Sequence, residues 1–157
     1  MTTERRVCRR SVWMAALAIG IFPVAATAAS FEMMTTGGCS CCHAWARHLR
    51  AGGHDVVVKD LAMGQLMKMK LDAGIPVALT ACHTARVDGY LIEGHVPEQD
   101  IRKLLAERPD ALGLLVPGMP IGSPGMESGD KREAYEVLLL KKDGSTEVFA
   151  KHGSQPE

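Results

Sequence analysis

The chain has 157 residues, of which 46% are hydrophobic and only 4% are aromatic. This length suits one domain with a modest core, which aliphatic side chains and methionines must fill. The 18 basic and 18 acidic residues balance, and no basic run with interleaved aromatic residues occurs, which argues against a nucleic-acid-binding protein.

The first 28 residues have the pattern of an export signal. Four arginines between positions 5 and 10 precede an apolar run over 12–26, which ends in the small-x-small triplet Ala26-Thr27-Ala28. We predict a signal peptide over 1–28 and a periplasmic mature protein without a membrane span. An uncleaved membrane tether is the alternative. Cleavage would leave 14 basic and 17 acidic residues, a net charge of about −3, and four cysteines.

The mature chain begins with a predicted β-α-β unit. A short strand over 31–36 ends at Gly37-Gly38, a helix follows over 42–51, and a β-branched strand covers 55–59. The short, bounded run of valines predicts that this second strand is buried. A crossover through a helix predicts that the two strands are parallel.

A second helix is predicted over 61–73. Met63, Leu66, Met67 and Leu71 recur at helical spacing, so we expect them to form its core-facing stripe rather than to bind a ligand. The histidines without other donors nearby, His48, His54 and His152, are expected at the surface.

The second half of the chain alternates short strands, one helix and a loop. Pro97 suits the first turn of a helix, and Asp143-Gly144 is a strong hairpin signal. The predicted segments are a strand or tight hairpin over 87–92, a helix over 97–107, an apolar run over 112–116, a Pro/Gly-rich loop over 117–126, and a closing hairpin over 135–141 and 146–151.

These elements predict one α/β domain over 29–152, with a frayed tail over 153–157. The expected architecture is a thioredoxin-like β-α-β unit with an inserted segment and a C-terminal β-hairpin. No internal repeat or second domain is visible in the sequence.

Three cysteines gather at the predicted turn from strand to helix. Cys39 and Cys42 form a C-x-x-C pair, the spacing of a redox-active dithiol, and a helix N-terminus favours a thiolate there. Cys41 adds a third thiol, which favours a metal site instead. A further alternative is a structural disulfide between Cys82 and one of the three, in a compartment where disulfides persist.

Other soft donors lie far downstream. Cys82 and His83 are adjacent in a stretch without helical pattern that could fold over the first cluster. His95, taken alone, is predicted to be a solvated histidine near a helix start. Met119 and Met126 each follow a glycine in the Pro/Gly-rich loop, where there is little core to fill. Thiolate, thioether and imidazole together select Cu(I) first and zinc second.

Several sequence blocks resemble the CopG-like family of exported copper-resistance proteins. They are Gly38-Cys39-Ser40-Cys41-Cys42, Ala81-Cys82-His83-Thr84-Ala85, Val87-Asp88-Gly89-Tyr90, the block over 92–97 and the block over 116–127. The resemblance covers nearly the whole mature chain. It implies a thioredoxin-like fold that binds copper, as Cu(I) or Cu(II) and with several ions, and a copper redox role. Carried over by motif, the metal ligands are Cys39, Cys41, Cys42, Cys82, His83, His95, Met119 and Met126.

The leading hypothesis is therefore a periplasmic copper-binding protein of copper resistance that holds Cu(I) and cycles its redox state, which would make it a copper oxidoreductase. One alternative is a thiol-disulfide oxidoreductase that uses Cys39 and Cys42. Another is a copper metallochaperone without redox activity. The expected partners are copper ions, and a copper exporter or other periplasmic cuproproteins.

Overall fold

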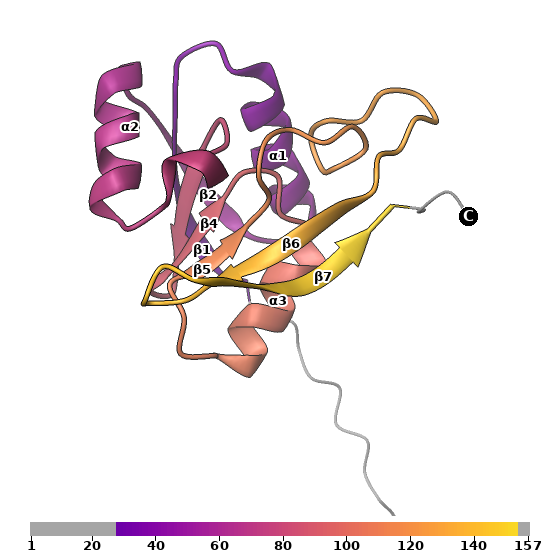
Figure 1. The fold of residues 1–157 in the computed structure, drawn as a ribbon. Coiled ribbons are helices and arrows are strands. Elements are labelled where there is room, and N and C mark those ends of the chain that lie inside the picture. Colours follow the sequence, from indigo (N-terminus) through magenta and orange to yellow (C-terminus); the bar gives the residue numbers. More distant parts are fainter. Residues whose placement is uncertain (1–27, 154–157) are drawn as a thin grey trace, which may run out of the picture.

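A seven-stranded mixed sheet organises the domain (Figure 1). The computed structural model describes residues 28–153, so the predicted signal peptide and the frayed tail lie outside the described residues. The strand order is β2-β1-β3-β4-β5-β6-β7, and the predicted α/β class is confirmed. The elements are β1 Ser30–Thr35, α1 Ser40–Ala51, β2 Asp55–Asp60, α2 Met63–Asp72, a 3-10 turn Val77–Leu79, β3 Thr84–Val87, β4 Tyr90–Glu93, α3 Glu98–Glu107, β5 Gly113–Leu115, β6 Tyr135–Leu140 and β7 Thr146–His152.

The predicted β-α-β unit is present, since β1 and β2 pair in parallel on either side of α1 in the sequence. Helix α1 begins two residues earlier than expected, because Cys39 adopts the extended N-cap conformation directly before Ser40. The prediction that the second strand is buried was wrong. Strand β2 is an edge strand that buries Val56 and leaves Val57 51% exposed, because only one of its faces lies against the core.

One face of the sheet is covered by α1 and α3. Trp45 and Leu49 of α1 and Ile101 and Leu104 of α3 are all fully buried in the main core. Phe31 of β1 meets Trp45 edge to face, with 6.4 Å between the ring centroids. Each such side chain contributes about 1.5–3 kcal/mol by leaving water. This packing fixes the start of α1 against the sheet.

The opposite face is covered by α2 and the segment that follows it. Ile75 joins Leu115 and Leu140 in a second, smaller core cluster. The predicted core-facing stripe of α2 was wrong at Met63 and Leu71, which are 65% and 47% exposed, whereas Leu66 is buried and Met67 is half-buried. Leu66 and Lys70 are the buried residues of this helix. They lie four positions apart and therefore share one face, which leaves Met63 and Leu71 exposed.

Two hairpins complete the sheet. Strands β3 and β4 form a tight antiparallel hairpin, β5 pairs in parallel with β4, and β6 and β7 form the predicted closing hairpin. The β2-β1-β3-β4 order supports the thioredoxin-like assignment, which stays a prediction. Among the described residues, none of the helices combines the length and the apolar character needed to cross a lipid bilayer.

The strand directions bring four segments to one edge of the sheet. The chain leaves β1 for Cys39, enters β3 from Cys82 and His83, and leaves β4 towards His95. It also leaves β5 there for the Pro/Gly-rich loop, since β5 runs parallel to β4. Residues more than forty positions apart therefore meet beyond the same strand ends.

Candidate metal centre

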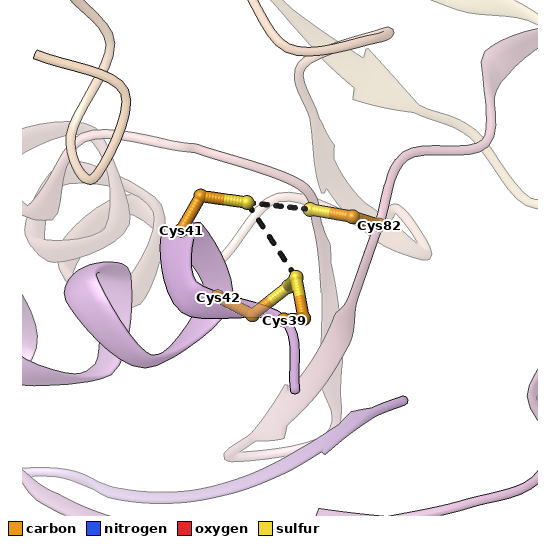
Figure 2. Close-up of side chains that lie close together, drawn as sticks. All are labelled: Cys39, Cys41, Cys42 and Cys82. Carbon is orange, nitrogen blue, oxygen red and sulfur yellow. Dashed lines mark hydrogen bonds between the residues drawn. A yellow bond between two sulfur atoms is a disulfide. The ribbon is translucent and has the colours of Figure 1, made fainter. Parts of the chain in front are cut away.

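The cysteine cluster, defined as Cys39, Cys41, Cys42 and Cys82, lies at the N-terminal end of α1 (Figure 2). Cys39 and Cys42 are joined by a disulfide, whereas Cys41 and Cys82 are free. Cys41 Sγ lies 3.5 Å from Cys39 Sγ and 3.9 Å from Cys82 Sγ. The four sulfurs thus form a continuous group whose centre is Cys41.

The start of α1 supplies a favourable electrostatic environment for this cluster. Cys39 is the N-cap residue and Cys41 lies in the first turn, where backbone N–H groups lack partners within the helix. No acidic side chain lies in that turn. The positive end of the helix dipole therefore faces the cluster, and this end of a helix stabilises anions.

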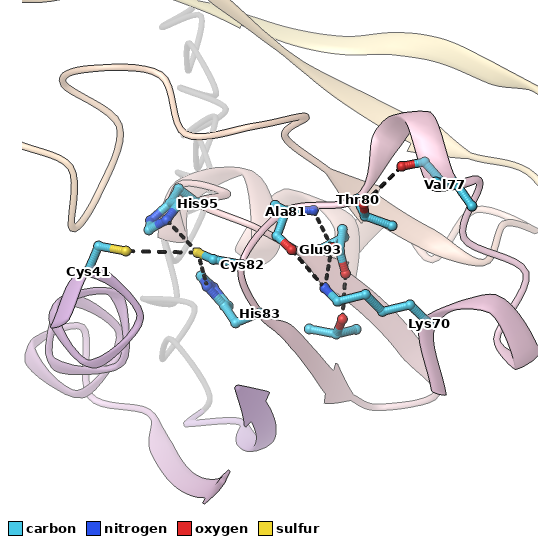
Figure 3. A network of polar contacts seen from close by, with 10 residues as sticks. Cys41, Lys70, Val77, Thr80, Ala81, Cys82, His83, Glu93 and His95 are labelled. Atoms are coloured by element: carbon cyan, nitrogen blue, oxygen red, sulfur yellow. Dashed lines mark hydrogen bonds and ion pairs between the residues drawn. The ribbon is translucent and has the colours of Figure 1, made fainter. Parts of the chain in front are cut away.

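Cys82 also contacts two imidazoles, as Figure 3 shows. Its Sγ lies 3.4 Å from Nδ1 of His83 and 3.2 Å from Nε2 of His95. The two rings meet edge to face, with 5.0 Å between their centroids. Cys82 is therefore shared between the sulfur group and this histidine pair, His83 and His95.

The contacts of His95 determine which of its ring nitrogens can bind a metal ion. His95 is fully buried, and its Nδ1 lies 2.8 Å from the carbonyl oxygen of Pro124. A carbonyl can only accept, so Nδ1–H donates to it and the lone pair is left on Nε2, the atom that faces Cys82. A ligand imidazole is oriented in this way when its other nitrogen binds a backbone carbonyl.

His83 is fully buried, and its Nε2 is one of the two buried side-chain polar atoms without a hydrogen-bond partner in residues 28–153. Its ring packs against Trp45 with 4.5 Å between centroids. Burial lowers the pKa of His83 well below its ordinary value, and the neighbouring His95 lowers it further. Burial also lowers the pKa of His95. Both rings are therefore neutral at pH 7, the form that binds metal ions.

Burial, together with the neighbouring Cys41, raises the pKa of Cys82 to about 12. Without a cation beside it, this thiol stays protonated. A metal ion would displace the proton, since a coordinating thiol is deprotonated by the charge of the ion.

The donor separations fit a bound metal ion. Two thiolates at about 2.3 Å from one tetrahedral ion lie about 3.8 Å apart, and a thiolate and an imidazole nitrogen lie about 3.5 Å apart. The 3.9 Å between the free sulfurs of Cys41 and Cys82, and the sulfur–nitrogen distances of 3.2 and 3.4 Å at Cys82, are close to these values. Cys39 Sγ lies 3.5 Å from Cys41 Sγ but could act as a thiolate only after its disulfide is reduced. Soft sulfur with imidazole is the donor set of copper or zinc.

Two glycines let the surrounding segments approach the site. A Cβ on Gly94 would lie 2.6 Å from both Ala81 Cβ and the carbonyl oxygen of Val116. A Cβ on Gly125 would lie 2.7 Å from the carbonyl oxygen of Cys41. The loop between β5 and β6 therefore packs directly on the first turns of α1, and Figure 1 shows it beside that helix.

Six of the eight predicted ligands come together in the structure. They are the four cysteines and the two histidines. The reading of His95 alone as a solvated histidine was wrong, because the loop residue Pro124 covers it. Met119 is 51% exposed and Met126 is half-buried. Within residues 28–153, the contacts that join the sulfurs and imidazoles include neither methionine, so their part in the site stays a prediction.

Two further results concern residues outside the predicted ligand set. His54, expected at the surface, is buried and lies 2.8 Å from the carboxylate of Glu98. The sequence analysis missed Pro124, because a backbone carbonyl leaves no sequence signal. It also missed Lys70 and Glu93, whose side chains are both buried beside Cys82 and His83. The spacing of Lys70, four positions after the apolar Leu66 on the predicted helix, could have indicated that this lysine lies on the buried face.

Comparisons with known proteins agree on one family. A family model described as a protein of unknown function, DUF411, matches residues 79–126. Two solved structures, described as copper resistance protein CopG in Form 1 and Form 2, are 40% and 39% identical in sequence to this chain. Form 1 has a TM-score of 0.76 and covers 82% of this chain, Form 2 has 0.75 and covers 81%, and both are matched over their full length. No curated protein matches the chain.

Proposed function

The chain belongs to the CopG family of copper resistance proteins, and on that premise we propose that it is a periplasmic protein that binds Cu(I) through cysteine and histidine. The observation that carries the proposal is Cys82, whose sulfur contacts both a free thiol and two imidazoles. Thiol–disulfide exchange requires a reactive thiolate, whereas the pKa of Cys82 is raised to about 12 and the pKa values of the two imidazoles beside it are lowered. Soft thiolates supported by imidazole are suited to Cu(I).

The ligands have different roles in this proposal. Cys41 and Cys82 are free and supply thiolates directly, whereas Cys39 and Cys42 supply theirs after their disulfide is reduced by two electrons. His83 and His95 supply neutral nitrogens. Met119 and Met126 remain candidate thioether ligands of the loop that packs on α1.

The arrangement supports more than one copper ion. Two separate donor groups exist, one made of four cysteines and one made of Cys82, His83 and His95. They share the sulfur of Cys82, and in this proposal that thiolate bridges neighbouring Cu(I) ions. Zinc is the less suited cargo, because a structural zinc site needs only four ligands in total.

We also propose a redox role for the bound copper. Thiolate favours Cu(I), while imidazole accepts both oxidation states, so a mixed site can lose one electron per ion to an external acceptor and hold the resulting Cu(II). Copper would then pass to an exporter or another periplasmic cuproprotein. A metallochaperone without the redox step would transfer copper in an unchanged oxidation state.

The test is an anaerobic titration of the reduced mature protein with Cu(I). A Cys39→Ser variant and a Cys42→Ser variant should each bind fewer ions or bind them more weakly than the wild-type chain. Unchanged stoichiometry and affinity in both variants would contradict the copper proposal. His48→Gln, an exposed position on α1, is the matched control.

The disulfide between Cys39 and Cys42 favours a second candidate, a thiol-disulfide oxidoreductase. That activity requires turnover of a disulfide substrate by metal-free protein in the presence of a dithiol reductant. It also requires indifference to Met119→Leu and Met126→Leu. The absence of such turnover would remove this candidate.

A further inference from the structure

A buried ion pair lies directly behind the histidine pair, on the α2 face of the sheet. Lys70 of α2 and Glu93 of β4 are each only 1% exposed, and Nζ lies 2.5 Å from Oε1 (Figure 3). Among residues 28–153, this is the one ion pair in which both side chains are that deeply buried. Neither charge faces solvent, so both are satisfied entirely by protein groups.

The pair holds the segment of Cys82 and His83 from both sides. Before Cys82, the backbone N–H of Ala81 donates to Glu93 Oε1 over 2.6 Å, and Lys70 Nζ donates to the carbonyl of Ala81 over 3.1 Å. After His83, the hydroxyl of Thr84 donates to Glu93 Oε2 over 2.5 Å. Cys82 and His83 are therefore the two residues between these anchors.

The same carboxylate belongs to the strand that delivers His95. Glu93 is the last residue of β4, and only Gly94 separates it from His95. The N–H of Gly94 donates to the carbonyl of His83 over 3.0 Å. Glu93 thus ties together the two chain segments whose side chains meet at Cys82 Sγ.

Packing alone does not require charges at these positions. Taking two charges out of water is costly, and a well-packed apolar pair of similar size is often as stable or more stable. Apolar side chains, however, could not bind Ala81 through both its N–H and its carbonyl. Directional hydrogen bonds to a charged group also constrain geometry more tightly than apolar contacts.

We infer that Lys70 and Glu93 are positioning residues for the metal ligands. This ion pair sets the distances between Cys82 Sγ and the imidazole nitrogens of His83 and His95. The inference rests on the proposed copper function and deepens it. Lys70 and Glu93 act through Ala81, Thr84 and Gly94, so they need not contact the copper ions.

The test compares Lys70→Met/Glu93→Gln with wild-type protein. The double variant removes both charges and leaves no buried charge unpaired. Cu(I) affinity, measured by competition with a chromophoric chelator, should fall by about 10- to 100-fold, the usual effect of losing partners that orient metal ligands. X-ray absorption at the copper edge should show fewer nitrogen neighbours per copper, a change that lower stability alone would not cause in folded protein.

Asp100→Asn is the matched control. Asp100 is a buried carboxylate that pairs with His152 over 2.6 Å, but it joins α3 to β7, and neither element holds a predicted ligand. The copper affinity of the Asp100→Asn variant and its number of nitrogen neighbours per copper should stay at the wild-type values. Thr84→Val removes one donor to Glu93 while keeping the side-chain shape, and should give a smaller loss than the double variant. If the double variant does not fold, Thr84→Val tests the positioning role by itself.

The outcomes separate this inference from the proposed function. If wild-type protein binds copper in a Cys82-dependent way while the double variant and Thr84→Val match it in affinity and nitrogen count, the positioning role is wrong and the copper function stands. An equal loss in Asp100→Asn would also overturn the positioning role. If wild-type protein does not bind copper, or Cys82→Ser binds as well as wild type, the proposed function itself fails.

Discussion

The two halves of the donor set differ in how the chain builds them. The helix half consists of Cys39, Cys41 and Cys42, which lie within four consecutive positions at the start of α1. Two of its three sulfurs are joined in a disulfide. The loop half is Cys82 and the histidine pair, which come from two segments; both histidines are fully buried and Cys82 is half-buried. One half depends on local sequence and redox state, and the other depends on tertiary packing.

This difference separates two ways of controlling a metal site. Reduction of one disulfide changes the number of thiolates that the helix half offers. The loop half offers the same donors in either state, because its tautomer and burial are fixed by Pro124, Trp45 and the strands. We therefore expect the helix half to set how much copper is held and the loop half to set where copper is first bound.

The largest effect should come from breaking the link between the halves. Cys82→Ser removes the sulfur that belongs to both donor groups. We expect Cu(I) affinity to fall by about 100-fold or more, beyond the range for losing a partner that only orients a ligand. Competition with a Cu(I) chelator measures it. An affinity within a factor of a few of wild type would show that the two groups do not share a site.

The second-largest effect should come from the redox state of the helix half. Protein with the Cys39–Cys42 disulfide intact should bind fewer Cu(I) ions than fully reduced protein, since two of its sulfurs are already bonded. Anaerobic metal analysis before and after dithiol treatment checks this. The loop half should still hold copper in the oxidised protein.

The control for this prediction is the double variant Cys39→Ser/Cys42→Ser, whose copper content should not respond to dithiol treatment. Equal copper content in oxidised and reduced wild-type protein would remove the distinction between the two halves.

A smaller effect is expected from each imidazole of the loop half. His95→Gln keeps a polar side chain beside Pro124 but removes the nitrogen that faces Cys82. We expect a loss of about 10- to 100-fold in Cu(I) affinity, with the sulfur neighbours in the X-ray absorption spectrum unchanged. His48→Gln on the exposed side of α1 should bind as wild type. Equal behaviour of the two variants would place His95 outside the site.

The smallest effect should come from the methionines. Met119→Leu and Met126→Leu keep the apolar volume and remove a soft thioether. We expect each to weaken Cu(I) binding by less than about ten-fold, below the usual effect of losing an orienting partner. No change in either variant would restrict the site to cysteine and histidine.

Much of the fold follows from local patterns. Gly37-Gly38 marks the end of β1, Asp143-Gly144 lies in the closing hairpin, and Pro97 precedes α3. The errors concern burial. Val57 and Met63 are apolar but exposed, because β2 is an edge strand and α2 turns its other side to the sheet. Periodicity shows that a helix has two faces, but the neighbouring elements decide which face is covered.

The kind of chemistry expected at the candidate site could be predicted from local sequence, because three cysteines at the start of a helix have few structural uses, and because the motif blocks identified a copper resistance family. Which distant donors join these cysteines depends on the fold. The directions of β1, β3 and β4 bring Cys82, His83 and His95 to the start of α1. The burial of His95, its tautomer and the Lys70–Glu93 pair behind it depend on contacts between segments far apart in the chain. Such contacts leave no local pattern to read.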